Sequence, residues 1–269
     1  SRPRDAALQG LAKAKRLAAL GLHQGVLPPQ ERPNISWLRT LGFAGADREV
    51  WRKAWEEAPL IARAAAASSS MWAANAATIS PSADCADGRL HASVANLQTM
   101  LHRSIEAPQT ERALRKVFAN DARFQVHAAL EPHDALSDEG AANHMRLCAE
   151  PGGAGVEVFV YGETQGRFPA RQTLAASRAI ARRHGLANER VVFARQSEEA
   201  IAAGAFHNDV VAVAHENVLL FHAHAFADKN AVLEDIRRKA ADLFEPVFLE
   251  VTEADLPLAE AVASYLFNG

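Results

Sequence analysis

Hydrophobic residues recur at helical spacing near the start of the chain. Over residues 5–20 they fall every three or four positions, and Gly21 follows as a stop signal, so we predict an amphipathic helix. The prolines within residues 27–33 cannot continue a helix. Shorter helical patterns follow at residues 37–43 and 47–57.

Beyond residue 90, extended apolar runs alternate with helical patterns, which is typical of an α/β fold. The runs Val210–Ala214 and Val218–His222 are separated by only three residues, short enough for a hairpin. A mixed sheet is therefore predicted, and a doubly wound Rossmann layout is disfavoured. Extended runs are expected at residues 90–95, 124–130, 156–161, 191–194, 210–214, 218–222 and 247–251, and helices at residues 110–119, 171–184 and 231–244.

Composition narrows the classes of protein. The 269 residues carry a formal charge of −3 with a pI near 6.4, which gives no basic face for nucleic acid. No apolar run is long enough to span a membrane. The start lacks both a signal peptide and a methionine, so we expect a cytoplasmic protein and a piece of a longer chain. The presence of only two cysteines, Cys85 and Cys148, argues against a disulfide framework as the basis of the fold.

The segment Asp138–His144 carries an acid, a glycine and an imidazole after an apolar run. It can be a helix start, with Asp138 as the N-cap and Glu139 in the first turn. Alternatively, Glu139 faces a pocket as a general acid/base or as the partner of a cationic substrate.

The segment Gly204–Asp209 precedes the run Val210–Ala214. In an extended chain His207 and Asp209 would lie on the same face and could address one ligand, with His207 exchanging protons near neutral pH. The alternative is a turn at Asn208 and Asp209 that leaves His207 exposed.

Several other polar residues have two interpretations. His222 and His224 have a spacing compatible with zinc, but no third ligand is close in sequence, so we favour two solvated histidines at a strand end. Four residues lie among apolar neighbours, where they would be either hydrogen-bonding posts in the core or ligand contacts: Asn75, His102, Arg103 and Arg171. The glycine-rich stretch 151–155 does not fit a nucleotide-binding spacing, and we interpret it as a loop that enters a strand.

Ten stretches, in order along nearly the whole chain, resemble one family, the N-succinylarginine dihydrolases of bacterial arginine breakdown. So many ordered matches are more specific than any single motif. They are Leu27–Pro33, Met71–Thr78, Pro81–Asp84, Val94–Leu97, His102–Ser104, Asp138–His144, Phe159–Gly162, Phe168–Gln172, Phe206–Asp209 and Ser264–Asn268.

The resemblance implies a pentein fold, an α/β propeller of ββαβ modules around a central funnel, in a single catalytic domain over residues 1–269. It also implies a hydrolase that converts N-succinylarginine to N-succinylornithine, two ammonia and carbon dioxide through a cysteine thiolate, without metal or cofactor, in a cytoplasmic homodimer that binds neither nucleic acid nor membrane. By matching motifs, Glu139 and His207 would be the acid/base pair and Asp209 would hold the guanidinium. Substrate contacts would come from Asn75, His102, Arg103 and Arg171.

The chain also departs from the family pattern. The family's nucleophilic cysteine lies in a glycine-rich segment near the C-terminus, and neither Cys85 nor Cys148 lies in such a segment. An early substrate loop is missing, and the connection from Gly162 to Arg167 looks short. We therefore expect a dihydrolase truncated at both ends, with its nucleophile beyond Gly269.

Two other functions stay open at this point. One is a guanidinium-binding module that does not catalyse, and the other is a related pentein activity such as arginine deimination. The ammonia yield from N-succinylarginine and from free arginine would separate deimination from dihydrolysis, since dihydrolysis releases two ammonia per turnover and deimination releases one.

Overall fold

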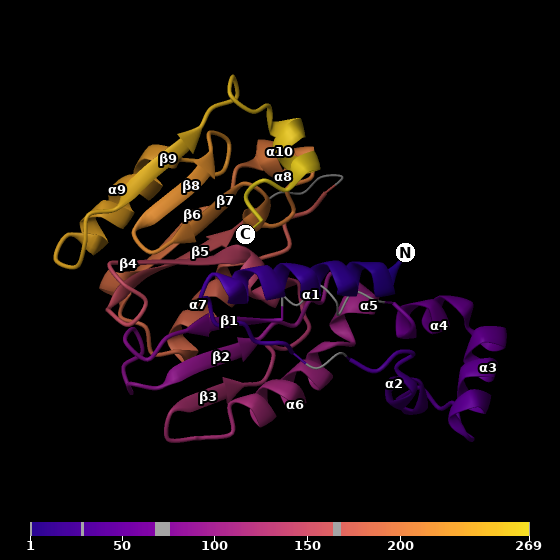
Figure 1. Ribbon diagram of the computed structural model, residues 1–269. Helices are drawn as coiled ribbons and strands as arrows, with labels where there is room; N and C mark the ends of the chain where they lie inside the picture. The colour runs from indigo at the N-terminus through magenta and orange to yellow at the C-terminus, as the bar shows by residue number, and fades with distance from the viewer. Residues whose placement is uncertain (1, 28–29, 68–75, 164–167, 269) are drawn as a thin grey trace. The chain divides into compact units, whose positions relative to one another are not determined.

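The chain folds into two compact units (Figure 1). The first comprises residues 1–73 and 100–113, and the second comprises residues 74–99 and 114–269. The computed structural model describes residues 2–27, 30–67, 76–163 and 168–268.

The first unit is helical. Its small core forms around Leu38, Val50 and Ala54, which are fully buried. Asn34 caps α2, because its side-chain oxygen accepts a hydrogen bond from the backbone N–H of Trp37 at 3.0 Å. The three helices predicted before residue 58 are confirmed, with small shifts at their ends. The helices are α1 (Pro3–Ala19), α2 (Ile35–Thr40), α3 (Asp47–Glu57), α4 (Pro59–Ala65) and α5 (Leu101–Ser104), and α6 (Ala107–Val117) runs across the boundary between the units.

The second unit contains, within its described residues, three three-stranded mixed sheets, each formed by a ββαβ module; the helix of the first module, α6, belongs largely to the first unit. In every sheet the first two strands are antiparallel, and the third strand pairs in parallel with the second after a helix. This repeat confirms the predicted α/β pentein fold of ββαβ modules. The strands are β1 (Ala77–Ser80), β2 (Leu90–Val94) and β3 (Phe124–His127) in the first sheet, β4 (His144–Cys148), β5 (Gly155–Tyr161) and β6 (Val191–Arg195) in the second, and β7 (Ala212–His215), β8 (Val218–His222) and β9 (Val247–Val251) in the third.

The connections in this unit are short helices and turns. The predicted hairpin between β7 and β8 is confirmed, because His215 pairs with Val218 across a two-residue turn. Residues 151–155 form a turn that enters β5, as predicted. The α-helices are α7 (Leu174–Arg183), α8 (Glu198–Ala203), α9 (Lys229–Ala240) and α10 (Leu258–Ser264), and the 3₁₀ turns are η3 (Asp134–Leu136), η4 (Gly140–Asn143), η5 (Asn188–Arg190) and η6 (Asn208–Val210).

Helix α9 is shared between two sheets. Its buried residues Val232, Ile236 and Ala240 belong to one apolar cluster that includes Val158 of β5 and Phe221 of β8. The second sheet is covered on its opposite face by α7, whose Ile180 packs in a separate cluster with Phe159. Both faces of the second sheet are therefore buried, which explains why β5 is apolar almost throughout.

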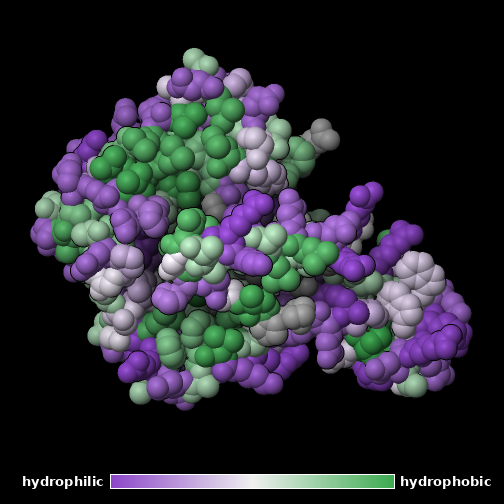
Figure 2. Space-filling model, viewed as in Figure 1, coloured by the Kyte–Doolittle hydropathy of each residue, from purple (hydrophilic) through white to green (hydrophobic). Residues whose placement is uncertain are grey.

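Among the described residues, the apolar cluster that contains α9 covers one face of the third sheet, and the other face is partly exposed. Leu219 and Phe221 point into the core, so the alternate residues of β8 lie on the other face, where Leu220 pairs with Leu249 of β9. Leu249 is 49% exposed and Val247 is 41% exposed. Figure 2 shows the resulting apolar surface over β8 and β9.

Three imidazoles meet on the polar face of the first sheet. The His91 Nδ1 atom lies 3.0 Å from His127 Nε2, and the ring of His184, which follows α7, lies 5.5 and 5.6 Å from theirs. His184 is fully buried, and each of its ring nitrogens lies 2.8 Å from a serine hydroxyl, on Ser80 and Ser93. Burial is the main cause that lowers the pKa of His184 to about 2 and that of His127 to about 4, so both are neutral near pH 7.

A buried ion pair joins the first two modules. Arg146 of β4 donates from Nε to Asp84 at 2.5 Å, and the backbone N–H of Gly155 donates to the same carboxylate at 2.7 Å. The side chains of Arg146 and Asp84 are 14% and 2% exposed.

None of the helices in the described ranges is long and apolar enough to cross a lipid bilayer.

Candidate active site

Glu139 and His207 lie in contact in the second unit, although 68 positions separate them in sequence. The His207 Nε2 atom lies 2.8 Å from Glu139 Oε2. Each residue directly precedes a 3₁₀ turn that leads into the first strand of a module, Glu139 before η4 and β4, and His207 before η6 and β7. The repeated module thus brings the two side chains together from equivalent places.

The backbone around Glu139 is held by local contacts. Gly140 adopts a left-handed conformation with φ of 62°, which favours glycine, and its N–H donates to Asp138 Oδ1 at 3.1 Å. The N–H of Glu139 itself donates to the side-chain oxygen of Gln172 at 2.7 Å. The segment starts a helix, as one of the two interpretations expected, but the helix is a 3₁₀ turn whose capping residue is Glu139 and not Asp138.

The Glu139–His207 pair, called the dyad below, is buried on its carboxylate side and accessible on its imidazole side. The Glu139 side chain is fully buried, whereas 16% of the His207 side chain is exposed. The Thr99 hydroxyl donates to Glu139 Oε1 at 3.2 Å, so both carboxylate oxygens have partners. Burial also raises the pKa of the neighbouring Asp138 to about 7. With Glu139 ionised, Nε2 of His207 donates to it and Nδ1 carries the lone pair that a general base needs.

Asp209 lies close to the dyad on a 3₁₀ turn over Asn208–Val210. The turn interpretation of this segment is therefore confirmed, and the argument that His207 and Asp209 share a strand face is wrong. His207 is half-buried and not exposed as the turn interpretation expected. Asn268 donates to Asp209 Oδ2 at 2.9 Å. Burial raises the pKa of Asp209, His207 opposes this rise and Glu139 adds to it.

Asp209 also lines an open cavity of about 720 Å³ in the second unit. Its walls combine polar side chains such as His144 and Asn268 with apolar ones such as Met145 and Phe267. His144 is itself paired with the buried Glu157 at 2.5 Å. The cavity therefore offers a carboxylate and an amide to a ligand on an otherwise mixed surface.

Arg171 is positioned by an aromatic ring next to the dyad. Its guanidinium carbon lies 4.6 Å from the centre of the Phe206 ring, within cation–π range. The Phe168 ring meets Phe206 edge-on at 5.0 Å. Phe206 directly precedes His207 in sequence. The stack therefore holds the Arg171 guanidinium next to the segment that carries His207, the expected base.

The remaining predicted contacts are distributed differently. His102 and Arg103 are half-buried in α5 of the first unit. Asn75 and residues 164–167 of the short connection lie outside the described residues. Substrate contacts by Asn75, His102 and Arg103 stay predictions.

The interpretation of His222 and His224 needs correction. His222 is fully buried rather than solvated: its Nδ1 accepts from the N–H of His224, and its Nε2 lies 2.9 Å from the carbonyl oxygen of Leu256. His224 contacts Glu199 and Glu253 through different ring nitrogens, at 2.8 and 3.7 Å. Within the described ranges no group of three or more His, Cys, Asp or Glu residues is arranged to hold a metal ion.

Both cysteines are buried. Burial raises the pKa of the Cys85 thiol to about 12, and the negative charge of Glu157 adds to the effect. Cys85 is therefore an unreactive thiol near neutral pH.

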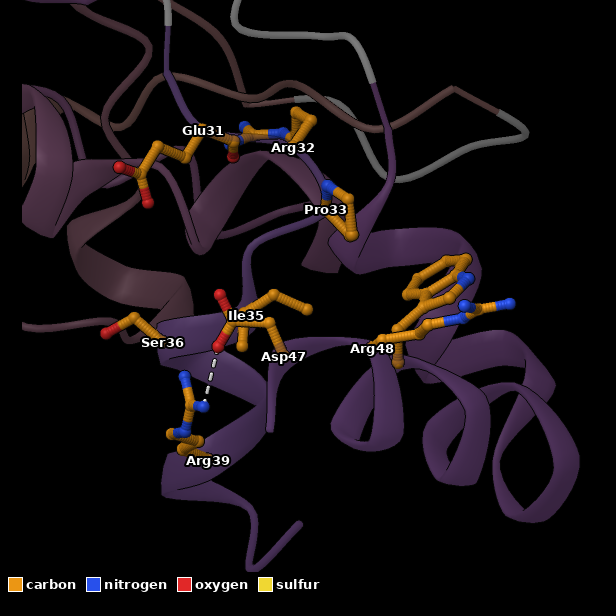
Figure 3. A pocket seen from close by; sticks show the side chains of 9 residues that line it. Glu31, Arg32, Pro33, Ile35, Ser36, Arg39, Asp47 and Arg48 are labelled. Atoms are coloured by element: carbon orange, nitrogen blue, oxygen red, sulfur yellow. Dashed lines mark hydrogen bonds and ion pairs between the residues drawn. The ribbon is translucent and has the colours of Figure 1, made fainter. Parts of the chain in front are cut away.

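A separate hollow of about 650 Å³ lies in the first unit (Figure 3). Arg39 and Arg48 lie at its rim with Trp51. Arg39 is paired with Asp47 at 2.7 Å, and both side chains are well exposed. The hollow is thus an open surface feature, and the Arg39–Asp47 pair in it is solvated.

Thr99 and Gln172 were not among the residues singled out from sequence. Gln172 ends the matching stretch Phe168–Gln172, and Thr99 lies two positions after the stretch Val94–Leu97. Neither residue has a local pattern that marks it, because each gains its role from contact with Glu139.

Comparison with known proteins agrees with the family resemblance found in the sequence. The family model described as succinylarginine dihydrolase matches residues 1–269. The chain is 58% identical over 273 residues to N-succinylarginine dihydrolase 2 of Caulobacter vibrioides, covering 100% of this chain and 61% of that protein. It is 52% identical over 275 residues to N-succinylarginine dihydrolase of Paraburkholderia xenovorans, covering 99% and 61%. The chain thus spans about three fifths of the length of these relatives.

Among solved structures, an apo arginine dihydrolase of the cyanobacterial ornithine–ammonia cycle aligns with a TM-score of 0.46 at 20% identity. The alignment covers 73% of this chain and 24% of that one.

Proposed function

This chain belongs to the succinylarginine dihydrolase family, and on that premise we propose that it supplies the acid/base and guanidinium-binding groups for hydrolysis of N-succinylarginine. The Glu139–His207 contact carries the proposal. A buried carboxylate fixes the imidazole, and the imidazole is the partly exposed member of the pair. This arrangement suits a histidine that moves protons to and from a substrate at neutral pH.

The proposed roles follow from charge. The guanidinium of the substrate is a planar cation, so a carboxylate such as Asp209 would bind it through charge-assisted hydrogen bonds. Arg171, stacked on Phe206, would bind a carboxylate of the substrate. His207 would take a proton from the attacking group and return one to departing ammonia, while Glu139 stabilises the imidazolium formed between these steps.

The nucleophile must come from elsewhere than Cys85 and Cys148. Both thiols are buried, and the high pKa of Cys85 keeps it protonated. This observation favours a second candidate function for the chain by itself, which is to bind the guanidinium ligand without turnover. A homodimer and a cytoplasmic location remain part of the proposal for the whole protein.

The first experiment measures binding of N-succinylarginine to the chain by calorimetry, with free arginine as the comparison ligand. We expect tighter binding of N-succinylarginine and a loss of about tenfold to a hundredfold in affinity for Asp209→Asn, because one charge-assisted contact is removed. The exposed His23→Gln serves as the control variant. Absence of binding, or equal binding by Asp209→Asn and the unmodified chain, would refute the assignment of this site.

A second experiment follows ammonia release with and without iodoacetamide. We expect no release by this chain alone. Release that alkylation abolishes would mean that Cys85 or Cys148 is the nucleophile after all. In a protein that does turn over, Glu139→Gln and His207→Ala should each lower kcat/KM by at least about a hundredfold.

A further inference from the structure

The loop that follows β2 is bonded, residue by residue, to the segment that carries Glu139. Asn96 donates to the carbonyl oxygen of Leu136 at 2.8 Å and accepts from the N–H of Asp138 at 3.1 Å. The N–H of Leu97 donates to the carbonyl oxygen of Asp138 at 3.0 Å. Residues 96–99 therefore form a template against which residues 134–139 are fixed.

The same series continues toward the carboxylate. Gln98 donates to the Ser137 hydroxyl at 2.5 Å, and the Thr99 hydroxyl donates to Glu139 Oε1 at 3.2 Å. Thr99 is the last member of the series and touches the side chain of Glu139 rather than its neighbours. The other carboxylate oxygen is the one that meets His207.

The template has a strained backbone at Leu97. Its φ is 49°, in the left-handed region that a branched side chain rarely adopts. Such a conformation costs on the order of one hydrogen bond and persists only where surrounding contacts enforce it. The bonds of Asn96 and Leu97 to Asp138 are contacts of this kind, and they place Thr99 beside Glu139.

We propose that Thr99, held by the Asn96–Thr99 template, is a positioning residue that orients the Glu139 carboxylate toward His207 and stabilises its ionised form. The inference rests on the role of the Glu139–His207 pair in the proposed function. A donated hydrogen bond favours the charged form of a carboxylate and restricts its rotation. Among the described residues, the titratable groups that interact with the carboxylate include His207, Asp138 and Asp209.

The test is a carbon-13 NMR titration of the Glu139 carboxyl group in the full chain. Thr99→Val removes the hydroxyl at nearly constant shape, and Thr99→Ala removes it with a smaller side chain. We expect both to raise the titration midpoint of Glu139 by about one pH unit, because the ionised form loses a donor. Thr99→Ser keeps the hydroxyl and should restore the midpoint of the unmodified chain. The exposed Thr40→Val, in the first unit, is the matched control and should leave the midpoint unchanged.

A purely structural role for Thr99 predicts a different result. In that case the variants would alter thermal stability while Glu139 titrates as before, or Thr99→Ser would shift the midpoint as far as Thr99→Val, and either result would overturn the inference. The titration needs no ligand. If N-succinylarginine fails to bind while the midpoint still depends on the Thr99 hydroxyl, the proposed function falls and the positioning role stands.

Discussion

His184 makes the stability of the second unit depend on pH in a way that the structure lets us calculate. Its ring is fully buried, and its two nitrogens face the hydroxyls of Ser80 and Ser93. Protonation would place a charge in this site beside the rings of His91 and His127. The informative change is His184→Gln, which keeps a polar side chain and removes the titrating group.

The sign follows from the two states of the protein. In the unfolded chain a histidine titrates near pH 6.5, whereas the folded state lowers the pKa of His184 to about 2. Between these values the unfolded chain binds a proton that the folded chain does not. The contribution of neutral His184 is therefore complete above pH 6.5 and is lost as pH falls below it. At about 1.4 kcal/mol per pH unit, the loss at pH 5.0 is about 2 kcal/mol.

The assay is urea unfolding at pH 7.5 and pH 5.0 on three proteins: the unmodified chain, His184→Gln, and the exposed His23→Gln as control. We expect His184→Gln to be less stable at pH 7.5, because serine contacts are lost, but to lose about 2 kcal/mol less on acidification than the other two. If all three proteins lose the same free energy of unfolding between the two pH values, the burial argument for His184 is wrong.

Three further outcomes test other features. Burial raises the pKa of Asp138 to about 7, so its ionisation is costly in the folded state and the stability of the chain falls as pH rises from about 4 through 7. In urea unfolding, the free energy of unfolding of Asp138→Asn should therefore increase by about 2–3 kcal/mol relative to that of the unmodified chain between pH 5 and pH 8. Asp84→Asn leaves Arg146 buried without its counter-charge and should lower the free energy of unfolding by about 3–5 kcal/mol. A loss below about 1 kcal/mol would contradict the conclusion that Arg146 and Asp84 form a buried ion pair. Leu249→Lys places a charge on the exposed face of the third sheet. It should reduce concentration-dependent self-association, measured by sedimentation, and should change the free energy of unfolding by no more than about 0.5 kcal/mol. Unchanged association would show that this face does not mediate contacts between copies of the chain.

The fold was predictable where a single element carries a strong pattern. The strand β5 and the helices α7 and α9 follow from long apolar or amphipathic runs that local periodicity reveals. The strands β1 and β4 were not predicted, because β1 has four residues and β4 carries His144 and Arg146. Those two polar side chains are accommodated by Glu157 and Asp84, which no local spacing relates to them.

The candidate site shows the same division. Glu139 and His207 each stood out as acid/base residues in a polar segment, but their contact depends on the packing of two modules and not on spacing. Thr99 has no pattern of its own, since a threonine after a strand is common. The histidine cluster was missed entirely, because its members come from β2, β3 and the residue after α7 and meet only in the folded chain.

Because α9 packs with side chains of two sheets, one module cannot be exchanged or removed without disturbing its neighbour. Because Ile236 belongs to one cluster with side chains of β5 and β8, replacing it by a smaller residue would destabilise two modules at once. Removing the third module would strip the cover from the second sheet and leave Val158 in water. The modules repeat in sequence order, but the second sheet depends on a helix of the third module, so the smallest separable piece that keeps this sheet covered includes both α7 and α9.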